Sequence, residues 1–112
     1  MIIKKVNDLP IEENPHKADV RKMYDHENAQ AMHMILQPGQ SLKPHITPVD
    51  VFFYVLEGSP DVRVGDETIT VEKDSLVESP KNIVHCISNQ SGSIARILVV
   101  KAPKQTGKAI LL

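Results

Sequence analysis

Two stretches of the chain decide the fold: residues 39–58, GQSLKPHITPVDVFFYVLEG, and residues 74–89, DSLVESPKNIVHCISN. Each contains a largely apolar run of strand length, Val51–Leu56 in the first and Ile83–Ser88 in the second. β-Branched and aromatic residues favour strands, whereas the Gly, Pro, Asp and Asn residues around these runs favour turns. The two stretches therefore predict two strands bounded by tight turns.

Shorter runs of the same kind lie on both sides, with turn residues between them. They are Val20–Tyr24, Ala31–Leu36, Val62–Val64, Ile69–Val71, Leu76–Val77 and Ile94–Val100. The pair Gly65-Asp66 predicts a hairpin, because glycine supplies the positive φ that two-residue hairpin turns need. Many short strands at this spacing are typical of an all-β sandwich or barrel. A closed barrel is favoured, since closure removes exposed strand edges and leaves an interior that suits a small ligand.

The spacing within the first stretch resembles the first motif of the cupin family. That motif is a glycine, five residues, His-x-His, three or four residues, a Glu, six residues and a glycine. Here the same positions hold Gly39, His45, Thr47, Val51 and Gly58. The frame of the motif is intact, but its second His and its Glu are replaced, so the metal-binding part is degenerate.

The second stretch resembles the second cupin motif: a glycine, five residues, Pro-x-Gly, two residues, a His, three residues and an Asn. Here these positions hold Asp74, Pro80, Asn82, His85 and Asn89. Asn82 replaces a glycine, and asparagine is one of the few side chains that tolerate a left-handed backbone. An aspartate is also acceptable in the turn at the first position.

The resemblance implies one small cupin domain over residues 1–112, an antiparallel double-stranded β-helix, or jelly-roll barrel. The barrel core spans about 20–101, with an N-terminal lead-in over 1–19 and a C-terminal tail over 102–112. The stretch from Lys101 onward carries lysines and no acid, but its end, Ala109–Leu112, is too apolar for a solvated tail. We expect that end to pack against the barrel or against a partner subunit.

Cupins that bind metal use two His and one Glu of the first motif and one His of the second. Of these positions only His45 and His85 match, because Val51 cannot ligate and the Thr47 hydroxyl is a poorer ligand than imidazole. Catalytic zinc and non-haem iron sites usually rest on three protein ligands. One hypothesis is a divalent transition metal (Zn, Fe, Ni or Mn) on His45 and His85. The other is a pair of pocket histidines that form hydrogen bonds or exchange protons without a metal.

A replacement ligand is best sought at Asp50, one residue before the position of the Glu. Strand alternation turns it outward, but a bulge beside the preceding proline would re-aim it. Glu78 is another candidate, on a strand whose inward face the sequence does not fix. We expect Thr47, Val51 and Asn89 to line the pocket.

Three further side chains are expected to lie away from the cavity. His33 alternates with two methionines that suit the barrel interior, so it should point outward. Cys86 follows His85 on its strand and should be an inert strand residue. His16 lies in a polar segment and is expected to be exposed.

The composition of the chain limits the kinds of binding partner that we expect. The 112 residues carry 13 basic and 14 acidic side chains, for a net charge of −1. This balance argues against a nucleic-acid partner or a membrane surface. The single cysteine rules out an internal disulfide and suits a reducing compartment. No signal sequence or membrane-spanning run is visible, so we expect a cytoplasmic protein, and the resemblance implies a homodimer.

Three functions remain open at this point. The first is an enzyme that acts on a small polar metabolite in the barrel, through metal-assisted or acid–base chemistry. The second is a non-catalytic module that binds or senses a small ligand. The third is a structural protein with an empty barrel. The fold alone does not choose between them.

Overall fold

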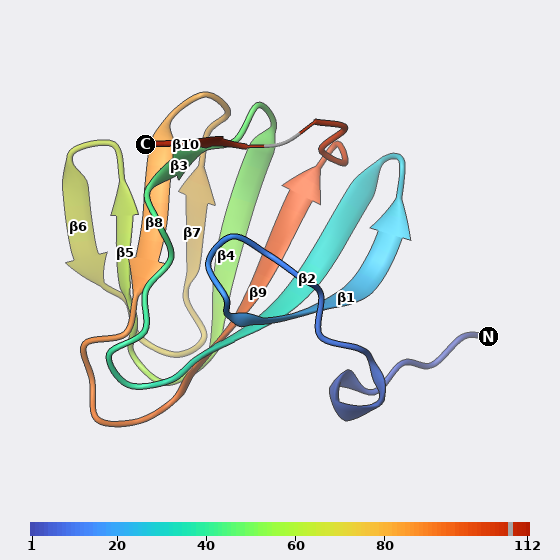
Figure 1. Ribbon diagram of the computed structural model, residues 1–112, viewed down its shortest axis with the longest axis horizontal. Coiled ribbons are helices and arrows are strands. Elements are labelled where there is room, and N and C mark those ends of the chain that lie inside the picture. The colour runs from blue at the N-terminus through green and yellow to red at the C-terminus, as the bar shows by residue number, and fades with distance from the viewer. Residues whose placement is uncertain (108) are drawn as a thin grey trace.

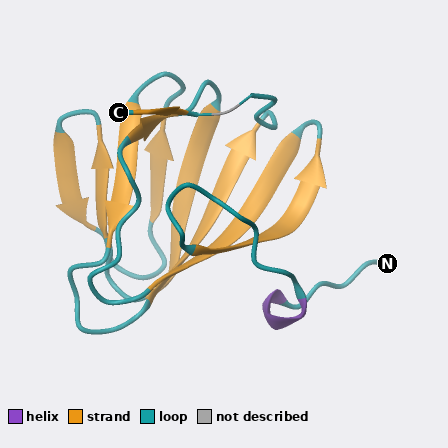
Figure 2. Cartoon of the chain, viewed as in Figure 1, coloured by secondary structure: helices purple, strands orange, loops and turns teal. Residues whose placement is uncertain are grey.

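The computed structural model describes residues 1–107 and 109–112. Strands make up almost all of its regular structure, with one short 3-10 turn, η1 (Val6–Asp8), near the N-terminus (Figure 2). The strands are β1 (Asp19–His26), β2 (Ala29–Leu36), β3 (His45–Ile46), β4 (Asp50–Glu57), β5 (Asp61–Val64), β6 (Glu67–Thr70), β7 (Leu76–Ser79), β8 (Val84–Ser88), β9 (Ala95–Ala102) and β10 (Ile110–Leu111). The predicted all-β class is confirmed.

The strands form two five-stranded antiparallel sheets, in the orders β1-β2-β9-β4-β7 and β10-β3-β8-β5-β6 (Figure 1). The chain passes back and forth between the two sheets, as expected for a double-stranded β-helix. In the described part of the chain, no helix has the length and apolarity needed to cross a membrane.

The core lies between the two sheets and follows from alternation along the strands. On β4, Val51, Phe53 and Val55 are buried, while the residues between them are partly exposed. Ile97 on β9 and Ile87 on β8 are completely buried. Burying an apolar side chain of this size stabilises the fold by about 1.5–3 kcal/mol. The inward faces of the strands therefore hold the sheets together and form the walls of the interior.

The predicted turns are present. β5 and β6 form a hairpin with Gly65 at a φ of 61° and Val64 opposite Glu67, so the loop has two residues. Asn82 has a φ of 65° and Asp74 a φ of 66°. Asn82 thus adopts the left-handed backbone that the comparison with the cupin motif implies, and Asp74, which also replaces a motif glycine, adopts the same conformation in its turn.

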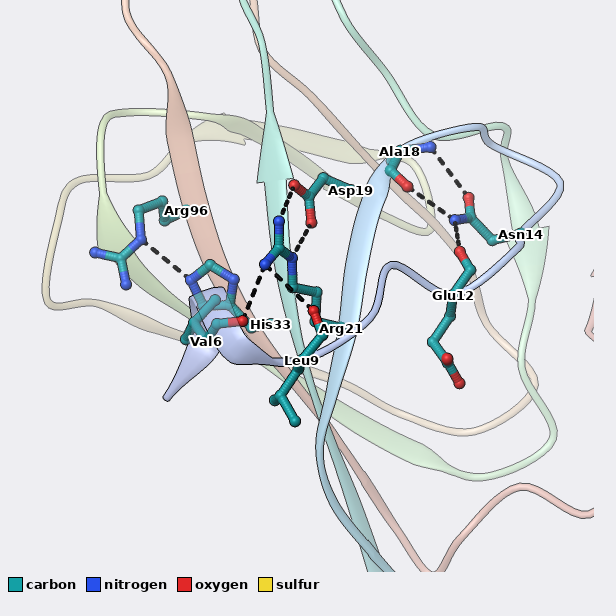
Figure 3. A network of polar contacts seen from close by, with 9 residues as sticks. All are labelled: Val6, Leu9, Glu12, Asn14, Ala18, Asp19, Arg21, His33 and Arg96. Carbon is teal, nitrogen blue, oxygen red and sulfur yellow. Dashed lines mark hydrogen bonds and ion pairs between the residues drawn. The ribbon is translucent and has the colours of Figure 1, made fainter. Parts of the chain in front are cut away.

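Hydrogen bonds from side chains to the backbone of the N-terminal lead-in hold this segment next to β1. Arg21 donates to the carbonyls of Val6 and Leu9, at 3.0 and 3.3 Å (Figure 3). The Asn14 amide bridges the carbonyls of Glu12 and Ala18, at 3.0 and 2.9 Å. These bonds fix the turn just before β1, which carries His16.

The C-terminal segment folds back onto the barrel as predicted, but through its backbone, because the side chains of Ile110, Leu111 and Leu112 remain exposed. Ile110 pairs with Ile46 and Leu111 with His45, so β10 becomes the edge of the second sheet (Figure 1). The backbone N–H of Leu112 donates to the carbonyl of Pro44 at 3.0 Å. Lys108, part of the basic stretch noted in the sequence, lies outside the described residues.

Candidate functional site

A cavity of about 500 Å³ lies between the sheets. Both terminal segments contribute to it, through residues such as His16 and Leu111. Most of the wall is apolar. The polar side chains that line it are Glu12, Glu13, Asn14, His16, His45, Thr47, His85, Lys101 and Gln105. Concave, mainly apolar sites with a few polar groups are typical of small-molecule pockets.

Two histidines meet inside this cavity. The pairing of β3 with β8 places His45 directly opposite His85, and side chains opposite each other on neighbouring strands share one face. Their Nε2 atoms are 3.1 Å apart, and their rings meet edge to face with centroids 4.5 Å apart. Residues 40 positions apart in the sequence thus form one imidazole pair.

The partners of the pair fix where its protons lie. His45 Nδ1 is 2.8 Å from the carbonyl of Lys43, and a carbonyl only accepts, so Nδ1 carries the proton and Nε2 of the neutral ring has a lone pair. The proton between the rings must then belong to His85 Nε2, which also lies 3.2 Å from Thr47 Oγ1. His85 Nδ1 is left to accept from the Ser79 hydroxyl at 2.7 Å.

Burial keeps both rings neutral at neutral pH. It lowers the pKa of His85 to about 4, with smaller contributions from His45 and Lys101. Burial also lowers the pKa of His45, partly opposed by the hydrogen bond to the Lys43 carbonyl. Neutral imidazole accepts and donates protons at its two nitrogens, so the pair is suited to proton transfer.

His16 also faces the cavity, although the sequence predicted that it would be exposed. Its ring centroid is 5.1 Å from that of His45, and its Nδ1 accepts from the backbone N–H of Lys43 at 2.9 Å. Burial, followed by the charges of His45, Lys43 and Lys101, lowers its pKa to about 4. The prediction failed because the lead-in is polar, and its docking depends on contacts 27 residues away.

Comparison with known proteins places this site in a family. The family model described as "Cupin domain" matches residues 32–101, more than half of the chain. The chain belongs to the cupin family. The match covers His45 and His85 and the strands that bring them together.

Two solved structures illustrate how this cupin compares. The TT1209 structure from Thermus thermophilus is 34% identical, with a TM-score of 0.79, covering 92% of this chain and 98% of that one. The polyketide cyclase RemF from Streptomyces resistomycificus is 22% identical, with a TM-score of 0.86, covering 100% of this chain and 85% of that one, which shows the shared fold alone.

Among curated proteins, the tetracenomycin polyketide synthase protein TcmJ from Streptomyces glaucescens is 33% identical over 72 residues. The match covers 63% of this cupin and 48% of TcmJ. The chain therefore spans about half the length of the curated relative it matches.

Asp50, the proposed replacement for the cupin Glu, does not reach the histidine pair. Its carboxylate is exposed and accepts from the backbone N–H of Lys81 at 2.9 Å. Together with Glu78 it lines a separate hollow of about 300 Å³. Val51 takes the inward position at the start of β4, so strand alternation turns Asp50 outward. The bulge that would have turned Asp50 inward does not have this effect here. The expectation for Asp50 was wrong.

Thr47 and Val51 both line the cavity, but Asn89 does not. Asn89 is completely buried in the turn between β8 and β9. Its amide donates to the carbonyls of Leu36 and Ser93, at 2.9 and 2.8 Å, and its oxygen accepts from Ser91. All of its hydrogen-bonding capacity is used to hold the turn, which corrects its predicted place in the pocket.

Two other sequence expectations concern the outward faces of strands. His33 is buried on the opposite face of β2 from the cavity, where its Nε2 accepts from Arg96 Nε at 3.1 Å (Figure 3). Cys86 is half-buried next to His85, and burial raises the pKa of its thiol. A thiol that stays protonated is a poor nucleophile, in agreement with the structural role expected for Cys86.

The distance between the two histidine nitrogens fits a bound metal ion, but the number of potential ligands around them is too small. Two nitrogens bound to one zinc-like ion at about 2.0–2.1 Å lie roughly 3 Å apart, close to the 3.1 Å between the histidine Nε2 atoms. However, the residues that the structure describes contain no group of three or more His, Cys, Asp or Glu side chains placed to hold a metal. Near the Nε2 atoms of the two imidazoles, the Thr47 hydroxyl lies 3.2 Å from His85, and the ring centroid of His16 lies 5.1 Å from that of His45.

Ser79 is the residue of the site that sequence reasoning missed. It is buried behind His85, on β7 opposite Val51, and fixes the tautomer of the ring. The signal that would have found it is alternation: once Glu78 faces outward, its neighbour Ser79 must face inward.

Proposed function

We propose that this cupin binds a small polar metabolite in the cavity and moves a proton on it with His45 and His85. The observation that carries the proposal is the 3.1 Å contact between the Nε2 atoms of two histidines on the cavity wall. The polyketide cyclase RemF shares this fold, but a shared fold does not fix the reaction.

In the proposed step, His45 acts as the base. Its Nε2 lone pair takes a proton from the bound metabolite, and the Lys43 carbonyl stabilises the resulting imidazolium through Nδ1–H. A small tilt of the His85 ring then lets its Nε2–H donate to Thr47 Oγ1, which already lies 3.2 Å away, instead of to His45. Return of the proton from His45 to a different atom of the metabolite completes an isomerisation with no net gain or loss of atoms.

The test begins with metabolites that raise the melting temperature of the wild-type protein, since a ligand of the folded state must do so. Each is then incubated with the protein in D₂O, and exchange of carbon-bound hydrogen is followed by NMR. We expect exchange with the wild type, its loss in His45→Gln, and its retention in His33→Gln, which alters a histidine outside the cavity.

Two results would count against this proposal. Binding without exchange would favour the alternative, a non-catalytic module that binds or senses a small ligand. Equal exchange in the wild type and in His45→Gln would remove His45 from the chemistry.

The second candidate is a divalent transition metal (Zn, Fe, Ni or Mn) held by His45 and His85, and the Nε2 spacing favours it. We would measure the metal content of untagged protein purified without chelators, together with His45→Ala/His85→Ala. About one metal per chain that disappears in the double variant supports this candidate. Wild-type protein that stays metal-free after incubation with all four metals removes it.

Two further features of the proposal come from the family resemblance and the composition. We propose a homodimer, which light scattering during gel filtration would distinguish from the mass of one 12.5 kDa chain. We also propose a cytoplasmic location, because a reducing compartment suits a chain with one free cysteine.

A further inference from the structure

Lys101 is a charged side chain in a row of apolar ones. The inward-facing residues of β9 are Ala95, Ile97, Val99 and then Lys101, and the last two line the cavity. Lys101 lies opposite Val51 on the neighbouring strand β4, and β9 itself is the central strand of its sheet. Lys101 is the last residue of the predicted barrel core, and its side chain lines the cavity.

The charge of Lys101 has no acidic partner. Its Nζ donates to the Gln105 side chain at 2.9 Å, and none of its contacts in the described residues is an ion pair. Glu12, on the cavity wall, pairs with Lys22 at 3.4 Å instead. A partly buried ammonium without a counter-charge costs free energy, and an anion placed beside it would recover part of that cost.

We infer that the ligand of this cavity is an organic acid anion, with an apolar body and a carboxylate that pairs with Lys101. The inference rests on the proposed function, which places a small metabolite in the cavity. The apolar body has matching walls in Met32, Met34, Leu42 and Val99. Among the described residues, Lys101 is the one lysine or arginine that lines this mainly apolar cavity, which favours a ligand with one negative group on a hydrocarbon frame.

The electrostatics around Lys101 agree with this inference. Burial lowers the pKa of the ammonium, as expected for a cation that lacks a partner. Its charge also contributes to the lowered pKa of His16 and of His85. A bound carboxylate would oppose both effects. The anion would therefore complete the charge balance of the whole cluster.

The experiment compares matched ligands that differ only in charge. Benzoate, cinnamate and 2-naphthoate are titrated into the full chain by calorimetry, alongside their neutral primary amides. The variants are Lys101→Met, which keeps the length of the side chain without its charge, and Lys101→Arg, which keeps the charge. Thermal unfolding of each variant establishes that it is folded.

We expect at least one carboxylate to bind the wild type more tightly than its amide. Lys101→Met should weaken that carboxylate by about 10- to 150-fold, the factor for a charge-assisted hydrogen bond of about 1.5–3 kcal/mol. The amide should change little, and Lys101→Arg should keep most of the preference for the carboxylate.

Other outcomes overturn the inference in distinguishable ways. Amides that bind as well as carboxylates, or carboxylate binding that survives Lys101→Met unchanged, would leave the proposed pocket intact but remove the choice of an anion. If no acid and no amide binds, the cavity is not a site for such ligands, and the proposed function loses its support as well.

Discussion

Each ring nitrogen of His85 lies within hydrogen-bond distance of a hydroxyl, and the two hydrogen bonds differ in length. Ser79 Oγ lies 2.7 Å from Nδ1, whereas Thr47 Oγ1 lies 3.2 Å from Nε2 and shares that proton with His45. Losing Ser79 leaves a buried acceptor without a donor. Losing Thr47 leaves the Nε2 proton with His45 as its remaining partner.

We therefore expect Ser79→Ala to destabilise the fold by about 1–3 kcal/mol, the cost of a buried polar group without a partner. Thr47→Val, which removes a hydroxyl at nearly constant shape, should cost less. Urea unfolding of both variants measures the difference. A larger loss for Thr47→Val would contradict the assigned proton positions.

The buried histidines also make stability depend on pH. The pKa of both His16 and His85 is lowered to about 4 from an ordinary value of 6.5. Between these values the unfolded chain binds more protons than the folded chain, so the free energy of unfolding decreases as the pH falls. The full stability is present above pH 6.5 and is lost as the pH falls toward 4.

Melting temperatures measured from about pH 7.5 to about pH 4.5 would show this dependence. The decrease should be shallower in His85→Gln, because one of the titrating groups is gone. A wild-type melting temperature that stays constant through this range would show that the imidazoles are not held neutral by burial.

At the scale of elements, the end of β4 depends on one glycine. Gly58 has a φ of 81°, and a Cβ there would lie 2.4 Å from the carbonyl oxygen of Ile94 and 2.9 Å from Ala95 Cα. Both contacts are with backbone, which cannot move aside easily. The closing glycine of the first cupin motif is thus required by the close approach of the chain at the start of β9.

Gly58→Ala should destabilise the protein by about 2 kcal/mol or more, through positive-φ strain and steric overlap. Gly92→Ala is the matched control, because a Cβ there meets no atom within 4 Å and the backbone is not left-handed. It should change stability by less than about 0.5 kcal/mol. Similar unfolding free energies for the two variants would contradict this account of the turn.

The strands and turns of the barrel were predictable because their signals are local. Alternation and β-branched runs marked β2, β4 and β9, and Gly65-Asp66 marked the hairpin between β5 and β6. The two-residue strands β3 and β10 were not predictable, since each depends on pairing with a distant segment.

The site was predictable only in part. Motif spacing identified His45 and His85, and their pairing across β3 and β8 follows from the fold. His16 was missed because it lies in a polar lead-in, and only the docking of that segment turns its side chain inward. Lys101 was missed because it begins a basic stretch of the sequence, although alternation from Ile97 and Val99 along β9 turns it inward.

At the scale of the whole molecule, the cavity is completed by both ends of the chain. The barrel strands supply most of the walls, while the N-terminal turn brings His16 and the C-terminal segment brings Gln105 and Leu111. Three histidines and one lysine thus come together from four separate parts of the sequence. This convergence, rather than any single motif residue, supports a ligand site with proton-transferring groups.

The most direct test of the central claim is nitrogen-15 NMR of the imidazole rings of the wild-type protein at neutral pH. We predict that His45 and His85 are both neutral, with the His45 proton on Nδ1 and the His85 proton on Nε2. His45→Gln and His85→Gln assign the signals. A charged ring in either residue, or the opposite tautomers, would contradict the proton-sharing pair on which the proposed function rests.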